Sequence, residues 1–143
     1  MTLRVMVVGG YGNFGSIVSR HLVVMPGVKL VISGRDTQKL QRKVDELKAQ
    51  SGTVCESWCG DAMGAGFKSV LGLMNIQLVI HTGGPFQGQA YAVAESCIDA
   101  GVNYCDLSDS RAFVTGISAL DARAKQAGVA VLSGCSSVPT LNH

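Results

Sequence analysis

The chain has 143 residues, 47% of them hydrophobic and 15% charged, and its formal net charge is +2. This length suits one globular domain with a hydrophobic core, and the composition excludes a disordered chain. The small net charge excludes the strongly basic surface of a nucleic-acid-binding protein, and no apolar run approaches the ~18 residues of a membrane-spanning helix.

The first half of the chain alternates apolar runs with helical patterns. Leu3–Val8 is an apolar run broken only by Arg4, which predicts a buried strand. Apolar residues at helical spacing then predict a helix with a buried stripe: Phe14, Ile17, Val18, Leu22 and Met25. Val28–Ser33 predicts a second strand, and a second helical stripe follows it: Leu40, Val44 and Leu47. The alternating segment Thr53–Cys59 predicts a third strand.

The second half repeats this alternation. A helical stripe is followed by a fourth strand, Gln77–Thr82; the stripe consists of Phe67, Val70, Leu71 and Met74. Ala90–Ala100 predicts a helix ended by Gly101, before a fifth strand at Val102–Leu107. The last helix is marked by an apolar stripe and closed by Gly128; the stripe consists of Phe113, Ile117, Leu120, Ala124 and Ala127. A sixth strand is predicted at Val129–Ser133.

Near-continuous apolar strands that alternate with helices are typical of an α/β protein whose parallel sheet is covered on both faces. Six strands joined by right-handed crossovers fit the doubly wound Rossmann fold, with strand order 3-2-1-4-5-6. We therefore expect a single domain over residues 1–143. In this fold ligands bind outside the carboxyl ends of the strands, so the loops after the strands carry the chemistry.

A glycine-rich segment joins the first strand to the first helix. Its residues are Gly10, Tyr11, Gly12, Asn13, Phe14 and Gly15, which match the pattern GxGxxG. We expect Gly10 to allow a tight turn, Gly12 to let a pyrophosphate approach the backbone, and Gly15 to let the helix pack close to the strand. The N–H groups at the helix N-terminus attract phosphates. This pattern between a strand and a helix predicts a dinucleotide site; the alternative is a turn without a ligand.

The end of the second strand indicates which dinucleotide binds. An NAD-binding domain usually has an acid about 20 residues past the glycines, where this chain has Ser33 and Gly34. A carboxylate there would repel a 2′-phosphate, whereas Ser33 and Arg35 can bind one. Asp36, with Thr37, is better placed to cap the second helix. The sequence therefore predicts NADP; the alternative for Arg35 is an ordinary surface charge.

Loops after three further strands supply additional candidates. Asp61 and Ala62 follow the third strand, where Asp61 lies near an adenine or serves as a turn or helix-capping residue. The segment after the fourth strand consists of Thr82, Gly83, Gly84 and Pro85. We expect its glycines to let the backbone pass close to a cofactor; the alternative is a structural turn. Charged residues after the fifth strand belong to a substrate site or to a salt-bridged loop; these are Asp106, Asp109 and Arg111.

The histidines and cysteines receive structural interpretations. His21 falls on the apolar face of the first helix and His81 lies inside the fourth strand, so we expect both to be packed. The sequence contains no CxxC pair, so it does not predict a zinc site. We expect the cysteines to be small buried hydrophobes in a reducing compartment: Cys55, Cys59, Cys97, Cys105 and Cys135. The segment MTLRVMVVGG lacks the features of a signal peptide, so we expect a cytoplasmic protein.

Four segments together resemble the N-terminal NADP-binding domain of the saccharopine dehydrogenase (saccharopine reductase-like) family. They are GGYGNFGSIVSRHL, ISGRD, TGGPFQGQAYAVAESCIDAGVNYCDLSD and GVAVLSGCSSVP. The resemblance implies an NADP-dependent oxidoreductase in which a second domain, absent from this chain, binds most of the small-molecule substrate. This chain would then bind NADP(H) without turnover of its own. The alternative function is a non-catalytic NADP(H)-sensing module that acts through a partner.

The resemblance also implies a role for each site residue. The pyrophosphate would meet Gly10, Gly12, Asn13, Phe14 and Gly15. The 2′-phosphate would meet Ser33, Gly34 and Arg35, and the nicotinamide side would be lined by Thr82, Gly83 and Pro85. The segment SGCSSVPT, residues 133–140, resembles a hinge that leads into the second domain.

Overall fold

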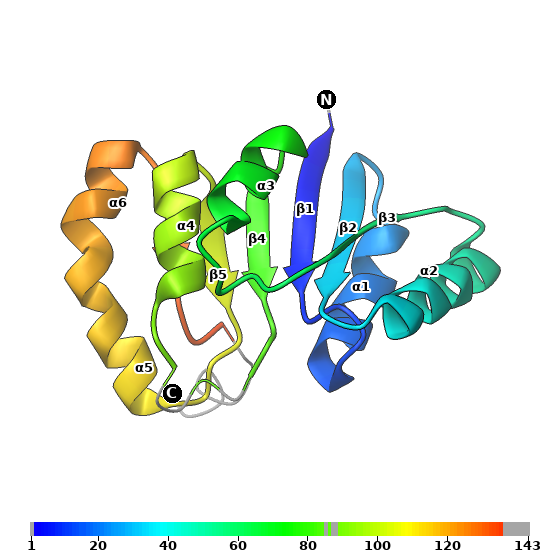
Figure 1. Cartoon of the computed structure of the whole chain (residues 1–143), viewed down its shortest axis with the longest axis horizontal. Coiled ribbons are helices and arrows are strands. Elements are labelled where there is room, and N and C mark those ends of the chain that lie inside the picture. Colours follow the sequence, from blue (N-terminus) through cyan, green and yellow to red (C-terminus); the bar gives the residue numbers. More distant parts are fainter. Residues whose placement is uncertain (1, 85, 87–88, 136–143) are drawn as a thin grey trace.

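The computed structural model describes residues 2–84, 86 and 89–135, and its core is one parallel sheet (Figure 1). The strands are β1 (Leu3–Val8), β2 (Val28–Gly34), β3 (Glu56–Cys59), β4 (Leu78–His81), β5 (Asn103–Asp106) and β6 (Val131–Leu132). Their order is β3-β2-β1-β4-β5-β6, and every neighbouring pair runs parallel. The predicted doubly wound α/β fold is confirmed. The chain changes direction across the sheet between β1 and β4, so the carboxyl ends of these strands bound a crevice.

Helices cover both faces of the sheet, because each face is apolar. On one face, α1 and α2 enclose a core cluster that includes Val7, Ile32 and Leu47. On the other face, α3 and α4 enclose a larger cluster around Met6 and Val79. In Figure 1, α1 and α2 lie beside β1 and β2, and α4 and α6 lie beside β4 and β5. The helices are α1 (Asn13–Val23), α2 (Thr37–Ser51), α3 (Phe67–Leu73), α4 (Ala92–Ala100), α5 (Arg111–Gly116) and α6 (Asp121–Ala127).

The two outer strands are shorter than predicted. Residues 53–59 and 129–133 carry strand-like patterns, yet β3 begins only at Glu56 and β6 comprises only Val131 and Leu132. Each outer strand pairs with a single neighbour, β2 or β5. The pairing with β3 uses only Val31–Gly34 of β2, and the pairing with β6 uses only Tyr104 and Cys105 of β5.

The buried face of α1 differs from the predicted stripe. The residues that face the sheet are Gly15, Ser19 and Val23, all of them buried. Small residues are required there because α1 approaches the β1–α1 turn closely: a Cβ atom on Gly15 would overlap the Gly9 carbonyl group. The hydroxyl group of Ser19 donates to the Gly10 carbonyl oxygen at 3.5 Å.

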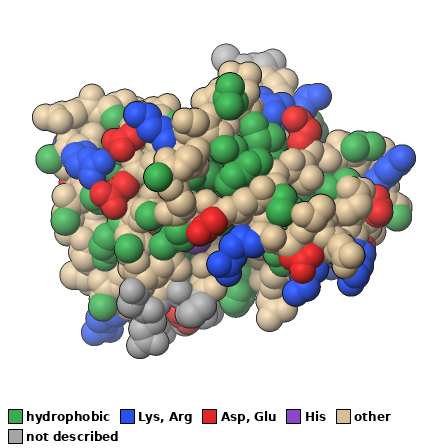
Figure 2. All heavy atoms as spheres, viewed as in Figure 1, with side chains coloured by type: hydrophobic (Ala, Val, Ile, Leu, Met, Phe, Trp, Pro, Cys, Tyr) green, Lys and Arg blue, Asp and Glu red, His purple; other side chains and the backbone are tan. Residues whose placement is uncertain are grey.

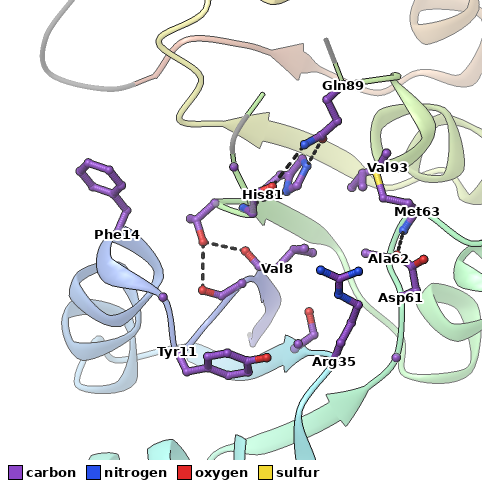
Figure 3. Close-up of a pocket in the computed structure, with 18 of the residues that line it drawn as sticks. Val8, Tyr11, Phe14, Arg35, Asp61, Ala62, Met63, His81, Gln89 and Val93 are labelled. Carbon is purple, nitrogen blue, oxygen red and sulfur yellow. Dashed lines mark hydrogen bonds between the residues drawn. The ribbon is translucent and has the colours of Figure 1, made fainter. Parts of the chain in front are cut away.

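Of the bulky residues predicted to form the apolar stripe of α1, some are packed against the core and others are exposed to solvent. Val18 and Leu22 pack against the core cluster, as predicted. Phe14 is 66% exposed, and its ring points away from the cavity described below (Figure 3). Ile17 is also largely exposed. His21, predicted to be packed, is exposed, so that prediction is wrong. Hydrophobic spacing alone locates this helix but does not identify its buried side.

The stripe predicted as one helix before β6 is divided into α5, a 3₁₀ turn over Ile117–Leu120, and α6. The break follows Gly116, where a Cβ atom would overlap the hydroxyl group of Tyr91. The buried stripe nevertheless continues through the break at Phe113, Ile117, Leu120 and Ala124. Gly101 and Gly128 cap α4 and α6 in the left-handed conformation, with φ of 72° and 71°, as predicted.

The surface carries charges of both signs. On the face seen in Figure 2, Lys and Arg side chains are interspersed with Asp and Glu. Within the described residues, no helix combines the length and hydropathy that crossing a membrane requires.

Candidate cofactor site

A cavity of about 650 Å³ lies at the carboxyl edge of the sheet, between the ends of β1, β2 and β4. This volume is within the usual range for a small-molecule or cofactor site. The cavity is lined by eleven of the residues predicted from sequence: Tyr11, Gly12, Asn13, Phe14, Ser33, Gly34, Arg35, Asp61, Ala62, Thr82 and Gly83. Gly10 and Gly15 support the turn behind it, and Pro85 lies outside the described residues.

The turn after β1 depends on Gly9, which sequence analysis did not single out. Gly9 has φ of 80°, the left-handed conformation that glycine adopts without strain. The N–H groups of Gly9 and Gly10 both donate to the Ser33 carbonyl oxygen, each at 3.0 Å. Gly10 is needed for another reason, because its Cβ position lies 2.7 Å from Cβ of Ile32. The tight turn therefore belongs to Gly9, and Gly10 provides a close approach to β2. Two consecutive glycines, Gly9 and Gly10, directly follow the strand, and this pair was the signal that could have identified Gly9.

Gly12 caps the N-terminus of α1 and lines the cavity. Among the described residues, no side chain caps this end of the helix. The first N–H groups of a helix have no partner within it, so α1 presents backbone donors and a partial positive charge here. The Cβ position of Gly12 lies 3.4 Å from the Gly9 carbonyl oxygen, so the fold itself leaves room for a small side chain.

Ser33 and Arg35 differ sharply in exposure at the end of β2. Ser33 is only 1% exposed, and its hydroxyl group donates to the Val7 carbonyl oxygen at 3.4 Å. Arg35 is exposed, and its guanidinium group points into the cavity (Figure 3). Within the part of the chain that the structure describes, the Arg35 side chain makes no ion pair. It is the cation best placed to meet an anion at this end of the cavity.

Tyr11 and Asp36 hold the loop that follows β2. The Tyr11 ring packs over Gly34, where any Cβ atom would overlap the ring. The backbone N–H of Asp36 donates to the Tyr11 hydroxyl oxygen at 3.1 Å. The Asp36 carboxylate accepts the N–H of Lys39 at 3.0 Å, which confirms that Asp36 caps α2. The nearest carboxylate after β2 therefore serves α2.

Asp61 makes a turn contact at the end of β3. Its carboxylate accepts the N–H of Met63 at 2.9 Å, while the side chain remains exposed at the cavity. Ala62 beside it is buried. The turn role is therefore present, and a contact with adenine stays a prediction.

Thr82 ties the end of β4 to the glycine turn. Its hydroxyl group lies 2.6 Å from the Val8 carbonyl oxygen, to which it donates, and 3.2 Å from that of Gly9 (Figure 3). The next residues, Gly83 and Gly84, also line the cavity. The two loops that meet at the switch point are therefore held together by one side chain.

His81 is packed, as predicted, but it also borders the cavity. His81 is 3% exposed, and its Nε2 atom lies 2.8 Å from Oε1 of Gln89. The backbone N–H of Gly83 donates to Nδ1 at 3.2 Å. Burial is the main cause that lowers the pKa of His81, so the ring is neutral near pH 7. Sequence reasoning missed His81 and Gln89 as cavity residues, because their contact is a tertiary one that residue spacing does not specify.

The loop after β5 is held by a buried carboxylate. Asp106 is fully buried and accepts hydrogen bonds from the Tyr104 hydroxyl group at 2.6 Å and the Ser133 hydroxyl group at 2.8 Å. The N–H groups of Ser108 and Gly134 also donate to it. Among the described residues Asp106 has no ion pair, so the expected salt-bridged loop is wrong for this residue. Asp106 joins the ends of β5 and β6.

The cysteines only partly match the expected burial. Cys55 and Cys97 are buried, but Cys59 and Cys135 are exposed, so the prediction of uniform burial is wrong. Burial raises the pKa of the Cys105 thiol to about 12. No group of three or more His, Cys, Asp or Glu residues that could hold a metal occurs within residues 2–84, 86 and 89–135.

A doubly wound sheet with a glycine turn, an open helix N-terminus and a cavity at the switch point defines a dinucleotide-binding Rossmann domain. The sequence profile described as "Saccharopine dehydrogenase NADP binding domain" matches residues 5–132. The chain belongs to this family and is an NADP-binding domain of saccharopine dehydrogenase-like oxidoreductases. No protein with curated annotation matches the sequence significantly.

Solved structures share the fold at low sequence identity. Saccharopine dehydrogenase (L-Glu forming) from Saccharomyces cerevisiae has a TM-score of 0.71 and 18% identity; the match covers 93% of this chain and 27% of the yeast chain. A short-chain dehydrogenase from Sphingobium yanoikuyae in complex with NADPH has a TM-score of 0.59 and 18% identity, over 92% of this chain and 71% of that one. YwfH, an NADPH-dependent reductase involved in bacilysin biosynthesis, has a TM-score of 0.72 and 12% identity, over 93% of this chain and 76% of that one. The chain thus spans about a quarter of the yeast enzyme's length.

Proposed function

We propose that the cavity binds NADP(H) and that the domain presents it to a substrate held mainly by a second domain. Bound NADP(H) supplies the hydride chemistry, and the residues of this chain bind and orient it. The observation that carries the proposal is Arg35, an exposed cation that lines the cavity and makes no ion pair with the described residues.

The pyrophosphate is assigned to the cavity wall at Gly12, Asn13 and Phe14. Their backbone lies at the N-terminus of α1, where N–H donors and the helix dipole favour an anion. Gly12 leaves this wall without a side chain. Gly10 and Gly15 contribute indirectly, because both permit the close packing that forms the turn.

The adenosine half is assigned to the ends of β2 and β3. Arg35 can hold a 2′-phosphate with its planar guanidinium group, and Gly34 lets the chain pass beneath the Tyr11 ring. The hydroxyl group of Ser33 is committed to Val7, so we assign Arg35 the principal charge contact. Asp61 and Ala62 would border the adenine.

The nicotinamide half is assigned to the end of β4, beside Thr82 and Gly83. Thr82 already donates to the glycine turn, so it acts mainly by shaping this wall. A second domain is supported by the length of the yeast relative, of which this chain covers 27%.

The test is a calorimetric titration of NADPH and NADH into the wild type and into Arg35→Ala and Arg42→Ala. Arg42 is an exposed arginine of α2 outside the cavity lining, so it controls for the loss of one positive charge. A hydrogen bond to a charged group contributes roughly 1.5–3 kcal/mol, so Arg35→Ala should weaken NADPH binding about tenfold to a hundredfold. Affinity for NADH, which lacks the 2′-phosphate, should change little.

The outcomes separate the alternatives. Equal losses for NADPH and NADH would assign Arg35 to adenine stacking or folding, and an unchanged NADPH affinity would make it a bystander. A wild type that binds neither dinucleotide contradicts the proposal. We also expect no NADPH oxidation by this chain with saccharopine-type substrates, and measurable turnover would contradict the assignment of the substrate to a second domain.

A further inference from the structure

Three groups at the end of β4 form a closed ring of hydrogen bonds. The Gly83 N–H donates to Nδ1 of His81 at 3.2 Å, and the Gln89 amide nitrogen donates to the Gly83 carbonyl oxygen at 3.3 Å. The ring closes between Nε2 of His81 and Oε1 of Gln89 at 2.8 Å. The two dashed contacts of Gln89 with this group are visible in Figure 3.

These three hydrogen bonds define the tautomer of His81. A backbone N–H can only donate, so Nδ1 must be an acceptor, and in a neutral imidazole Nε2 then carries the hydrogen. That hydrogen is directed at the Gln89 carbonyl oxygen, which leaves the Gln89 amide hydrogens for Gly83. All three contacts are therefore satisfied at once by one tautomer of His81 and one orientation of Gln89. A protonated His81 would bring an Nδ1 hydrogen against the Gly83 N–H.

The surroundings restrict the His81 ring to this position. It is 3% exposed and packs edge-on against Phe86, with ring centroids 4.8 Å apart. The titratable groups that face it from β5 are Tyr104, whose ring centroid lies 6.3 Å away, and Asp106, which pairs with His81 in register. Among the described residues of the loop after β4, Gly83, Phe86 and Gln89 contact the ring, and none of them carries a charge. The ring of contacts borders the cavity, since His81, Gly83 and Gln89 all line it.

We propose that neutral His81, with Gln89, is a positioning residue that holds the backbone on both sides of Gly83 where the nicotinamide half of NADP(H) binds. This inference rests on the proposed function and extends it to residues that touch neither the pyrophosphate nor the 2′-phosphate. The two peptide groups on either side of Gly83 are both held, because the N–H of the first donates to His81 and the carbonyl oxygen of the second accepts from Gln89. Protonation of His81 opens the ring of contacts and releases the first of these peptide groups.

The test compares two ligands that differ only in the nicotinamide ring, NADPH and 2′-phospho-ADP-ribose. They are titrated into the wild type, His81→Phe, His81→Asn and Gln89→Met. Phenylalanine keeps a buried aromatic ring without the acceptor, whereas asparagine keeps an acceptor near the position of Nδ1. Loss of one buried acceptor corresponds to about a tenfold change in affinity. We expect His81→Phe and Gln89→Met to weaken NADPH about tenfold, 2′-phospho-ADP-ribose less than twofold, and His81→Asn to retain most of the NADPH affinity.

A pH series gives a readout that a merely structural role would not move. In the wild type, the ratio of NADPH affinity to 2′-phospho-ADP-ribose affinity should fall as the pH decreases below neutrality, because His81 takes up a proton. Protonation of the 2′-phosphate cancels from this ratio, since both ligands carry that group. The ratio for His81→Asn should not depend on pH over the same range.

The failures of the two proposals are distinguishable. If the wild type binds neither ligand, the proposed function is wrong and the inference falls with it. If the wild type binds both and His81→Phe weakens both equally, or neither, the positioning role is overturned while NADP binding stands. Should His81→Phe not fold, Gln89→Met and His81→Asn decide the question on the same criteria, because Gln89 is only partly buried.

Discussion

The Cβ position of Gly12 lies 3.4 Å from the carbonyl oxygen of Gly9, an ordinary van der Waals distance. The backbone of Gly12 is also extended, with φ of −73° and ψ of −179°, which any residue can adopt. The fold therefore does not require glycine at this position, although the position lines the cavity.

We predict that Gly12→Val keeps the fold and loses NADPH binding, because the side chain would occupy the space assigned to the pyrophosphate. Circular dichroism and thermal melting check the fold, and calorimetry checks the affinity. Gly12→Ala should give an intermediate loss. Affinity equal to that of the wild type in Gly12→Val would show that the pyrophosphate lies elsewhere.

Gly15→Ala should behave in the opposite way and destabilise the protein. A Cβ atom there would overlap the Gly9 carbonyl group and approach the Thr82 hydroxyl oxygen to 2.8 Å. Overpacking of this kind costs about 1–3 kcal/mol or more in the free energy of unfolding. Urea denaturation measures the loss, and Gly72→Ala, in α3, is a control whose Cβ position has no neighbour within 4 Å. A Gly15→Ala variant as stable as the wild type would mean that α1 can shift.

Tyr104→Phe should destabilise the protein more than Tyr91→Phe. The Tyr104 hydroxyl group donates to the buried Asp106 carboxylate at 2.6 Å, whereas the Tyr91 hydroxyl group donates to the neutral Phe113 carbonyl oxygen at 2.9 Å. A hydrogen bond to a charged group contributes about 1.5–3 kcal/mol, and a neutral one about 0.5–1.5 kcal/mol. Chemical denaturation of both variants gives the comparison. Equal losses would contradict the stronger role assigned to the hydrogen bond between Tyr104 and Asp106.

The free energy of unfolding should decrease as the pH falls below 6.5, in part because of His81. Burial lowers the pKa of His81 from 6.5 in the folded protein, so the unfolded chain binds this proton first. The contribution of neutral His81 to the free energy of unfolding is complete above pH 6.5, and it is lost as the pH falls through the pKa of His81 in the folded protein. Urea denaturation at pH 7.5, 6.5 and 5.5 should show a smaller decrease in His81→Asn, and identical decreases would contradict the assignment.

Several features of this protein follow from the sequence by itself. Six apolar runs between helical patterns determine the α/β fold, because strands buried on both faces lack polar alternation. The glycines after Val8 and the absence of an acid at Ser33 and Gly34 indicate a dinucleotide site and NADP. Asp36 as the cap of α2 also follows from local chemistry. These are properties of neighbouring residues, so short-range patterns contain them.

Tertiary structure alone decided the other features. The buried side of α1 is set by its close approach to Gly9, which excludes bulk at Gly15 and leaves Phe14 in solvent. The ring of contacts through His81 and Gln89 exists because the Gln89 side chain lies against the end of β4. Asp106 meets Ser133 because parallel pairing of β5 and β6 brings their ends together. Each contact joins positions whose distance depends on how the chain packs, and residue spacing does not specify that distance.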